Sequence, residues 1–477
     1  MAVTKITESF SEKKQTFNNY LHHPHLFDCA EFNILKLFQY ALFREEGFNA
    51  RPFWKLPSFL ISIIFFIKRL KIRNPQKITP NSRAEIIIYE PYQIVINKNN
   101  QALSRYLENI LQSLSREKTI ILNVHWQIET IPSDNSTLVY KEYYDYFSLA
   151  PLTKEDVELL NALKQTYKKI QQNIPLNEKK KRIFEEVIQI FWQQYRATRE
   201  IIKHYPFLKV ALMQEHYQNE GMYLALKRQG IKIIELQHGL ISEKDMFYVY
   251  SPKINPIKEK CLFGDEIWVY GEYWKNVLLK GSEYTHEQIK ILGYYLYEEK
   301  NINEEFYSFQ ENIRKKYKNI LLFTAQKNLE HHLAEYINWL CTDLSKNSMP
   351  HTLLMIKPHP GATQNIQQFI RPTLVPIQIV DYPLNWLFQL CTHHISIYST
   401  TLYDALRYNI PHNYALNIPL FADYVDDIVQ TGIAIKLEPY ENPLRKKTNS
   451  TAFYPPSYYF DTFSRVTFLK LLNTHLM

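Results

Sequence analysis

Short runs of β-branched and aliphatic residues alternate with longer stretches of helical periodicity along most of the chain. This alternation is typical of parallel sheets whose strands are joined by crossover helices. In the first part of the chain, the predicted strands span 84–89, 119–125, 209–214, 231–236, 266–270 and 289–292. In the second part, they span 319–324, 352–356, 377–380, 394–398 and 413–416. We therefore predict an α/β protein with two Rossmann-like domains.

A polar stretch, 298–318, separates the two sets of strands. It is rich in Glu, Asn and Lys, and it contains neither Pro nor Gly. This composition predicts a linker or an exposed helix, and it places the domain boundary near residue 300. We expect an N-terminal domain of residues 1–300 and a C-terminal domain of residues 301–477. A last predicted helix, 458–477, could pack on either domain.

The charge and the cysteines limit the classes of partner and compartment. Lys and Arg number 56 and Asp and Glu 48, a formal charge of +8 that favours an anionic partner. No nucleic-acid-binding module is recognised, so we expect no nucleic acid. The four cysteines lie far apart without a CxxC pair, which indicates a reducing compartment rather than disulfides or a zinc knuckle. The polar N-terminus has no apolar signal-peptide core, so a cytoplasmic protein is expected.

One segment, 53–73, points towards a membrane. Its uncharged run, 56–67, has 12 residues, fewer than the roughly 18 to 20 that a spanning helix needs. Four cations follow: Lys68, Arg69, Lys71 and Arg73. The run is either a buried core helix or an in-plane anchor whose cations bind anionic headgroups. The second interpretation makes the protein peripheral at the cytoplasmic face of a bacterial inner membrane.

The first candidate group for chemistry lies at the ends of two predicted strands. Gln237, His238 and Gly239 follow strand 231–236, and Glu215 follows the strand before it. Ligands bind beyond the carboxyl ends of parallel strands, so His238 is expected to face a substrate as a general base or to be an ordinary loop histidine. Glu215 is a second candidate base, or it orients His238. Gly239 is expected to permit a tight turn or a close backbone approach.

A second group follows strand 352–356 and contains Lys357, His359, Pro360 and Gly361. Prolines on both sides of His359 restrict the backbone and hold the imidazole in a fixed direction. Together with Lys357, His359 could bind or protonate the phosphate of a leaving nucleotide. An ordinary proline-rich turn is the alternative.

A third group lies where strand 394–398 gives way to a predicted helix. Its members are Ser399, Thr400, Thr401 and Asp404. Hydroxyls and unpaired backbone N–H groups at a helix N-terminus form an anion site. A capping box between Thr401 and Asp404 explains the same residues without a ligand. Both hold together if Ser399 and Thr400 face a phosphate while Thr401 caps the helix.

The order of these motifs resembles the GT-B glycosyltransferases of bacterial surface polysaccharide synthesis. The resemblance covers about residues 205–420 and rests on the motifs QHG, GDEIWVYGEYW, ILGYY, LLFTAQ, IKPHP and SIYSTTLYDALRYNIP. It is strongest to transferases that use CMP-activated Kdo or sialic acid. It implies two Rossmann-like domains that face each other across a cleft, with the acceptor on the N-terminal domain and the donor on the C-terminal domain.

The resemblance also implies roles for individual residues. In the sialyltransferase and Kdo transferase families, a His-Pro motif and a Ser/Thr pair hold the CMP phosphate. The matching positions here are His359, Pro360, Ser399 and Thr400. An acidic motif ending in glycine supplies the base in those sialyltransferases, and its only counterpart here contains Glu220. The identity of the base is therefore open.

The chain is also similar to the teichoic-acid glycerophosphotransferases, which use CDP-glycerol. That likeness implies His238 as the base, and Ser399 or Thr400 with Asp404 at the donor. Both groups of relatives use cytidine nucleotides, so we expect a cytidine donor of a nonulosonate such as sialic acid or Kdo. The expected acceptor is a hydroxyl of a capsule or lipopolysaccharide glycan.

Other reactions stay open at this point. They are a CDP-polyol phosphotransferase, a UDP-sugar-dependent transferase or epimerase on the same fold, and an inactive carbohydrate-binding protein. No GxGxxG, Walker A or HExxH motif is present, so no cofactor or metal is expected. Lysine, histidine and hydroxyl groups could replace a divalent cation at the phosphate.

Overall fold

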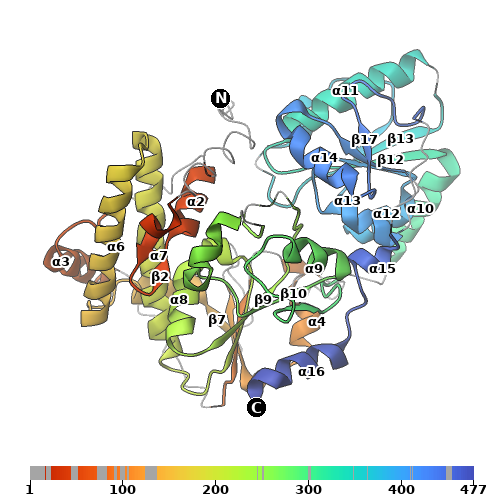
Figure 1. Ribbon diagram of the computed structural model, residues 1–477. Helices are drawn as coiled ribbons and strands as arrows, with labels where there is room; N and C mark the ends of the chain where they lie inside the picture. Colours follow the sequence, from red (N-terminus) through yellow and green to blue (C-terminus); the bar gives the residue numbers. More distant parts are fainter. Residues whose placement is uncertain are drawn as a thin grey trace. The chain divides into compact units, whose positions relative to one another are not determined.

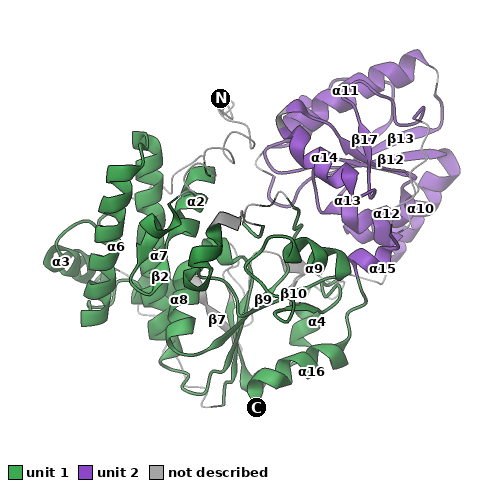
Figure 2. Ribbon diagram, in the orientation of Figure 1, with its two compact units in different colours: residues 1–96, 102–297, 461–477 green, residues 97–101, 298–460 purple. Residues whose placement is uncertain are grey.

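The computed structural model of the chain forms two compact units, which Figure 2 shows in different colours. Unit 1 contains residues 1–96, 102–297 and 461–477, and unit 2 contains residues 97–101 and 298–460. The structure describes residues 17, 23–44, 52–71, 83–90, 94–96, 102–104, 107–123, 137–243, 245, 247–249, 252–298, 302–347, 349–362, 364–408, 410, 412–446 and 454–477.

Unit 1 is built on a sheet of seven parallel strands. They are β3 (Ile86–Glu90), β6 (Thr119–Asn123), β7 (Thr137–Val139), β8 (Val210–Met213), β9 (Lys232–Leu236), β10 (Glu266–Val269) and β11 (Ile289–Ile291). Their order in the sheet is β11-β10-β9-β8-β3-β6-β7. The chain thus extends the sheet in one direction from β3 and in the other from β8. Such a reversal is where doubly wound sheets bind ligands at their carboxyl edge.

Some helices of unit 1 pack on this sheet, and others pack on those helices (Figure 1). These helices are α2 (Leu35–Phe43), α3 (Ser58–Arg69), α4 (Glu108–Leu111), α5 (Tyr140–Phe147), α6 (Lys154–Asn173), α7 (Glu178–Ile202), α8 (Glu220–Arg228) and α9 (Glu272–Leu279). Two short antiparallel pairs accompany them: β1 (Asp28–Cys29) with β2 (Phe32–Asn33), and β4 (Ile94–Ile96) with β5 (Ala102–Ser104). A Cβ on Gly221 would lie 2.1 Å from the carbonyl oxygen of Phe191, so glycine is what lets α8 pack closely on α7.

Unit 2 has a second parallel sheet, of six strands. They are β12 (Asn319–Thr324), β13 (Thr352–Lys357), β14 (Ile377–Ile379), β15 (His393–Ser396), β16 (His412–Leu416) and β17 (Ile435–Leu437), in the order β14-β13-β12-β15-β16-β17. The strand order reverses between β12 and β15. Its helices are α10 (Glu304–Lys316), α11 (Glu330–Lys346), α12 (Leu384–Leu390), α13 (Thr401–Asp404), α14 (Ala422–Gln430) and α15 (Pro456–Tyr459).

The two sheets confirm the predicted pair of Rossmann-like domains. Each of the eleven predicted strands has a counterpart whose ends differ from the prediction by at most two residues. The strands β7 and β17 were not predicted. The polar stretch 298–318 forms α10, whose Phe306 and Ile313 are buried in the core of unit 2. It is therefore part of the second domain rather than a free linker.

The last segment of the chain returns to unit 1, so the assignment of all of 301–477 to the C-terminal domain was wrong for residues 461–477. The backbone N–H of Asp461 donates to the Tyr270 carbonyl over 2.8 Å. The helix α16 (Arg465–Leu476) follows, and the ring centroids of its Phe468 and of Trp268 lie 5.9 Å apart. Hydrogen bonding to strand ends and aromatic packing together fix this segment on the first sheet.

The apolar segment 53–73 forms α3, and the interpretation of α3 as a buried core helix was wrong. Only Ile61 and Phe65 of this helix are buried. Among the described residues, no helix is both long enough and apolar enough to cross a membrane. Residues 72–73 lie outside the described part of the chain.

Candidate functional site

Glu215 and His238 lie together at the carboxyl edge of the first sheet. Each follows the end of its strand by two residues, and these strands, β8 and β9, are neighbours. Nε2 of His238 lies 3.3 Å from Oε1 of Glu215, and the two side chains are 17% and 15% exposed. The structure thus pairs the two residues that the sequence offered as alternative bases, and both side chains are partly exposed.

The turn that carries Glu215 has an unusual backbone. Glu215 has a φ of 55° and a ψ of 70°, in the left-handed region that non-glycine residues rarely adopt. The side-chain amide of Asn219 donates to the carbonyl of Glu215 over 2.9 Å and to that of Gln214 over 3.3 Å. These bonds hold a conformation that costs about 1–2 kcal/mol in an unsupported L-residue.

Gln237 fixes the loop on which His238 sits. Its Oε1 accepts from the backbone N–H of Tyr270 over 2.9 Å, and its Nε2 donates to the carbonyl of Gly239 over 2.9 Å. The hydroxyl of Tyr295 donates to the Gln237 carbonyl over 2.6 Å. Nδ1 of His238 is enclosed and has no hydrogen-bond partner among the described residues. A ligand therefore reaches the imidazole on the Nε2 side, where Glu215 lies.

A buried carboxylate lies beneath this pair. Glu235, within β9, lies 2.9 Å from Nδ1 of His216 and accepts from the hydroxyls of Tyr248 and Tyr284, each over 2.8 Å. Burial alone raises the pKa of Glu235, but His216 and the hydroxyls outweigh it and lower the pKa to about 2. The sequence analysis missed this network, although a charged residue inside the apolar strand KIIEL was a visible signal.

Glu220 has a different environment from Glu215. Its side chain is buried at the start of α8, and its Oε1 has no hydrogen-bond partner among the described residues. Burial raises its pKa to about 8. Glu220 is therefore closed to a substrate in this structure.

The second group of candidates follows β13 in unit 2. The backbone N–H of Gly361 donates to Nδ1 of His359 over 2.9 Å, so a neutral His359 carries its proton on Nε2. Lys357 pairs with Asp381, an almost fully exposed residue, at 2.6 Å. Pro360 is exposed. Any anion that binds Lys357 thus competes with one solvated carboxylate.

The backbone conformation of the two candidate loops does not itself require glycine. A Cβ on Gly239 would meet nothing within 4 Å, and one on Gly361 would make an ordinary contact of 3.4 Å with Nδ1 of His359. Neither glycine has a positive φ. A small side chain fits at both positions.

The third group differs most from its prediction. The helix α13 contains only four residues, Thr401–Asp404, and no side chain caps it at Thr400. The hydroxyl of Thr401 instead lies 2.9 Å from the hydroxyl of Thr324, so the predicted capping box was wrong. A four-residue helix has little macrodipole, and the predicted anion site loses that contribution. The hydroxyls of Ser399 and Thr400 remain at the strand end.

A neutral hydrogen-bond chain organises this edge of unit 2. Nε2 of His394 lies 2.9 Å from the Thr324 hydroxyl, and its Nδ1 lies 2.7 Å from Oδ1 of Asn413. Burial lowers the pKa of His394 to about 4, although the Asn413 bond raises it in part. The amide of Gln326 bonds both to the carbonyl and to the N–H of Tyr398, over 2.9 and 3.0 Å.

The sheet order brings the second and third groups to one edge. The strands that precede them, β13 and β15, both lie next to β12. Two strand spacings separate those strands, which corresponds to about 10 Å. His359 and Ser399 therefore belong to one edge of unit 2, at the point where the strand order reverses.

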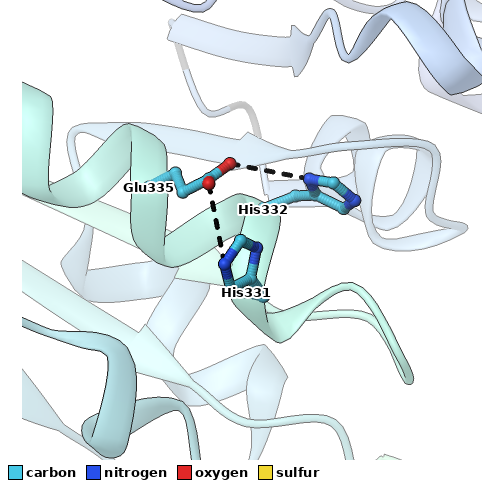
Figure 3. A group of neighbouring side chains, drawn as sticks. All are labelled: His331, His332 and Glu335. Atoms are coloured by element: carbon cyan, nitrogen blue, oxygen red, sulfur yellow. Dashed lines mark ion pairs between the residues drawn. The ribbon is translucent and has the colours of Figure 1, made fainter. Parts of the chain in front are cut away.

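Figure 3 shows one further cluster, which the sequence analysis did not identify: His331, His332 and Glu335 on α11. The carboxylate of Glu335 lies 3.6 Å from Nε2 of His331 and 3.7 Å from Nδ1 of His332. Their ligand atoms lie within 4.8 Å of one another, so the group could hold a metal ion. All three side chains are largely exposed on one helix, and a structural zinc site has four ligands. We assign this group no role in the reaction.

No protein-family model and no curated protein matches this chain. Solved structures do match this chain. UDP-GlcNAc 2-epimerase from Methanocaldococcus jannaschii is 12% identical, with a TM-score of 0.47 over 82% of this chain and 99% of that one. The enzyme from Neisseria meningitidis bound to UDP-GlcNAc is 11% identical, with a TM-score of 0.43 over 82% and 100%. A UDP-forming α,α-trehalose-phosphate synthase from Burkholderia vietnamiensis is 10% identical, with a TM-score of 0.43 over 82% and 97%.

Proposed function

We propose that this chain is a glycosyltransferase that moves a sugar from a nucleotide-linked donor to an acceptor hydroxyl. The observation that carries the proposal is the Glu215–His238 pair, 3.3 Å apart and partly exposed at the carboxyl edge of the first sheet. A carboxylate and an imidazole in contact can take up a hydroxyl proton near neutral pH. Unit 1 is accordingly the acceptor-binding domain.

The proton moves to the accessible side of the pair. Because Nδ1 of His238 is enclosed, an acceptor hydroxyl approaches Nε2 or the Glu215 carboxylate. Loss of the proton makes the oxygen nucleophilic, and it attacks the anomeric carbon as the bond from that carbon to the phosphate oxygen breaks. The neighbouring charge stabilises whichever partner holds the proton.

Unit 2 is proposed to bind the donor. His359, with its proton on Nε2, and Lys357 are the cationic or donor groups at the end of β13. Ser399 and Thr400 add hydroxyls two strand spacings away. Donors aimed at the departing phosphate stabilise the negative charge that develops on it. With these residues at the phosphate, the proposed reaction would not need a divalent cation.

Two donor classes are compatible with this site. The sequence resemblance favours a CMP-linked nonulosonate and a capsule or lipopolysaccharide acceptor. UDP-sugars, for which several of the similar structures are named, form the second class. A UDP-sugar epimerase is the second candidate function, because an acid–base pair such as Glu215 and His238 can also exchange a proton at a sugar carbon.

Calorimetric titration with CMP, CDP, UDP and GDP tests the donor site. We expect one nucleotide to bind to the wild-type chain and to lose at least about tenfold in affinity in His359→Ala, equivalent to about 1.4 kcal/mol. His351→Ala is the matched control, because His351 is exposed elsewhere in unit 2. No binding of any nucleotide, or equal binding by both variants, contradicts the assignment.

The products then separate the reactions. A glycosyltransferase releases nucleotide only when an acceptor is present, whereas an epimerase converts the nucleotide sugar without an acceptor. A polyol-phosphate transferase leaves a phosphodiester in the product. We expect transfer that persists in EDTA, and loss of transfer in EDTA contradicts the role proposed for Lys357 and His359.

A further inference from the structure

The helix α3 has its apolar face turned away from the protein. A surface helix normally buries a stripe of apolar residues and exposes polar ones. In α3 the buried residues are Ile61 and Phe65, and Phe65 stacks on Trp192 with a centroid distance of 5.8 Å. The exposed side holds Leu56, Phe59, Leu60, Ile63, Phe66, Ile67 and Leu70. At 100° per residue, the members within α3 cover an arc of about 120° that contains no polar side chain.

These are large exposures for large apolar side chains. Phe59, Phe66 and Leu70 are 64%, 67% and 73% exposed. The two serines of the helix lie outside the arc, and the hydroxyl of Ser62 donates to the carbonyl of Ser58 over 3.0 Å. A contiguous exposed apolar patch of this kind marks an interaction surface.

The charges at the C-terminal end of this helix are all positive. Lys68 lies 4.8 Å from the centroid of the Phe53 ring, and the Arg69 guanidinium lies 3.9 Å from that of Tyr146. Lys71 follows the helix. No described carboxylate pairs with these three cations, and residues 52–71 contain no Asp or Glu. Lys55 differs, because it pairs with Glu185 at 2.6 Å.

The segment that leads into the helix is also hydrogen-bonded to the rest of unit 1. The backbone N–H of Phe53 donates to Oε1 of Gln189 over 2.7 Å, and Nζ of Lys164 donates to the carbonyl of Leu56 over 2.7 Å. Figure 1 shows α3 at the outer side of α6. The apolar arc is thus a fixed, outward face.

We propose that this face docks in the plane of an anionic lipid bilayer. The apolar arc would enter the boundary between headgroups and acyl chains, while Lys68, Arg69 and Lys71 bind anionic headgroups. A second copy of the chain fits the surface less well, because a twofold contact between two α3 helices brings like cations together with no acid on the segment to neutralise them. The proposal does not depend on the reaction proposed for Glu215 and His238.

Vesicle sedimentation of the full chain tests this docking. We expect the wild-type chain to sediment with vesicles of phosphatidylcholine mixed with phosphatidylglycerol, and to release as salt rises. The double variant Phe59→Ser with Phe66→Ser, and the double variant Lys68→Glu with Lys71→Glu, are each expected to lower the partition coefficient at least about tenfold.

Two matched controls isolate the surface. Leu374→Ser removes an apolar side chain that is 94% exposed in unit 2, and Lys316→Glu with Lys346→Glu makes the same charge change there. Both controls should sediment like the wild-type chain. Because all substituted side chains are exposed, circular dichroism should show an unchanged fold.

Three outcomes overturn the proposal. The wild-type chain stays in the supernatant with anionic vesicles, the controls lose binding as much as the α3 variants, or the chain is a dimer that Phe59→Ser with Phe66→Ser dissociates and that does not bind vesicles. Nucleotide binding to unit 2 is expected to be unchanged in every α3 variant, so failure here is distinguishable from failure of the enzyme assignment.

Discussion

The carboxyl edges of the two sheets are pinned in the same way but charged differently. In each unit, a glutamine just beyond one strand bonds to the backbone just beyond a neighbouring strand of the sheet. Gln237 bonds to Tyr270 in unit 1, and Gln326 bonds to Tyr398 in unit 2. Behind the first edge lies the buried carboxylate of Glu235 with His216. Behind the second lies the neutral chain from Thr324 through His394 to Asn413.

This difference is compatible with proton transfer at the first edge and anion binding at the second. The first edge carries the Glu215–His238 pair, and a carboxylate next to an imidazole is suited to proton transfer. An edge organised by neutral hydrogen bonds leaves hydroxyl and imidazole groups to donate to an anion without a competing buried charge. The comparison predicts that changes at the first edge affect proton transfer and stability most strongly, whereas changes at the second affect binding.

The largest expected effect is on turnover, from Glu215→Gln and His238→Gln. Each variant keeps the side chain's approximate size and removes an acid–base group, so we expect kcat to fall by about 10²- to 10⁴-fold. Nucleotide affinity should not change, because the residues proposed to bind the donor lie in unit 2. Transfer rates and calorimetry measure the two quantities. His204→Gln changes an exposed histidine elsewhere in unit 1 and is the control. Near-normal turnover in both Glu215→Gln and His238→Gln would show that the pair is not the base.

The next effect is on stability, from Glu235→Gln. The change leaves His216, Tyr248 and Tyr284 around a neutral amide, and each hydrogen bond to a charged group contributes about 1.5–3 kcal/mol. Asn413→Ala removes neutral hydrogen bonds from the other edge and should cost about 1–3 kcal/mol. Denaturant unfolding compares the two. Equal losses would mean that the charge of Glu235 does not distinguish the edges.

The sequence predicted the sheets better than it predicted the side-chain networks. Strands such as β12 and β13 are continuous apolar runs, which parallel strands buried on both faces require. The adjacency of Glu215 and His238 also followed from strand order. The capping box failed because the Thr401 hydroxyl bonds to Thr324, which lies 77 residues away in the chain. Spacing within a segment carries no information about such a partner.

The same reason explains the other differences. Glu235 is bonded by Tyr284, which lies 49 residues further along the chain. The helix α16 belongs to unit 1 because Phe468 meets Trp268 there, and nothing in the sequence of 461–477 distinguishes the two domains. The outward face of α3 is likewise hidden in the sequence, because an apolar run of 12 residues reads the same whether it is buried or exposed.

A smaller effect is a pH dependence of stability at Glu220. Its folded pKa of about 8 lies above that of a solvated Glu, so the folded state retains the proton and loses stability as the pH rises from about 4.5 to 8. Acidification from pH 7 to pH 5 should stabilise the chain by about 2 kcal/mol through this group. Glu220→Gln should remove that gain. Denaturant unfolding at both pH values measures it, and an equal pH response in the variant contradicts the buried, protonated carboxyl.

His394 is expected to respond in the opposite direction. Its folded pKa of about 4 lies below that of a solvated His, so the unfolded state binds a proton first and stability falls as the pH drops from about 6.5 to 4. Between pH 7 and pH 5 this loss should be about 2 kcal/mol, and His394→Gln should abolish it. Unfolding of the variant at both pH values is the measurement. A loss of the same size in His394→Gln would assign the acid sensitivity to other groups.

The smallest effect is expected at the ion pair between Lys357 and Asp381. Asp381 is 99% exposed, and such surface pairs contribute about 0–1 kcal/mol. Asp381→Asn should therefore leave stability unchanged and release Lys357 for the donor phosphate, which raises nucleotide affinity by no more than about fivefold. Calorimetry at low and high salt measures the gain, which should shrink as salt screens the charge. Weaker nucleotide binding in Asp381→Asn would mean that Asp381 positions Lys357 for the phosphate rather than competing with it, and the second edge would then depend on a charge pair as the first does.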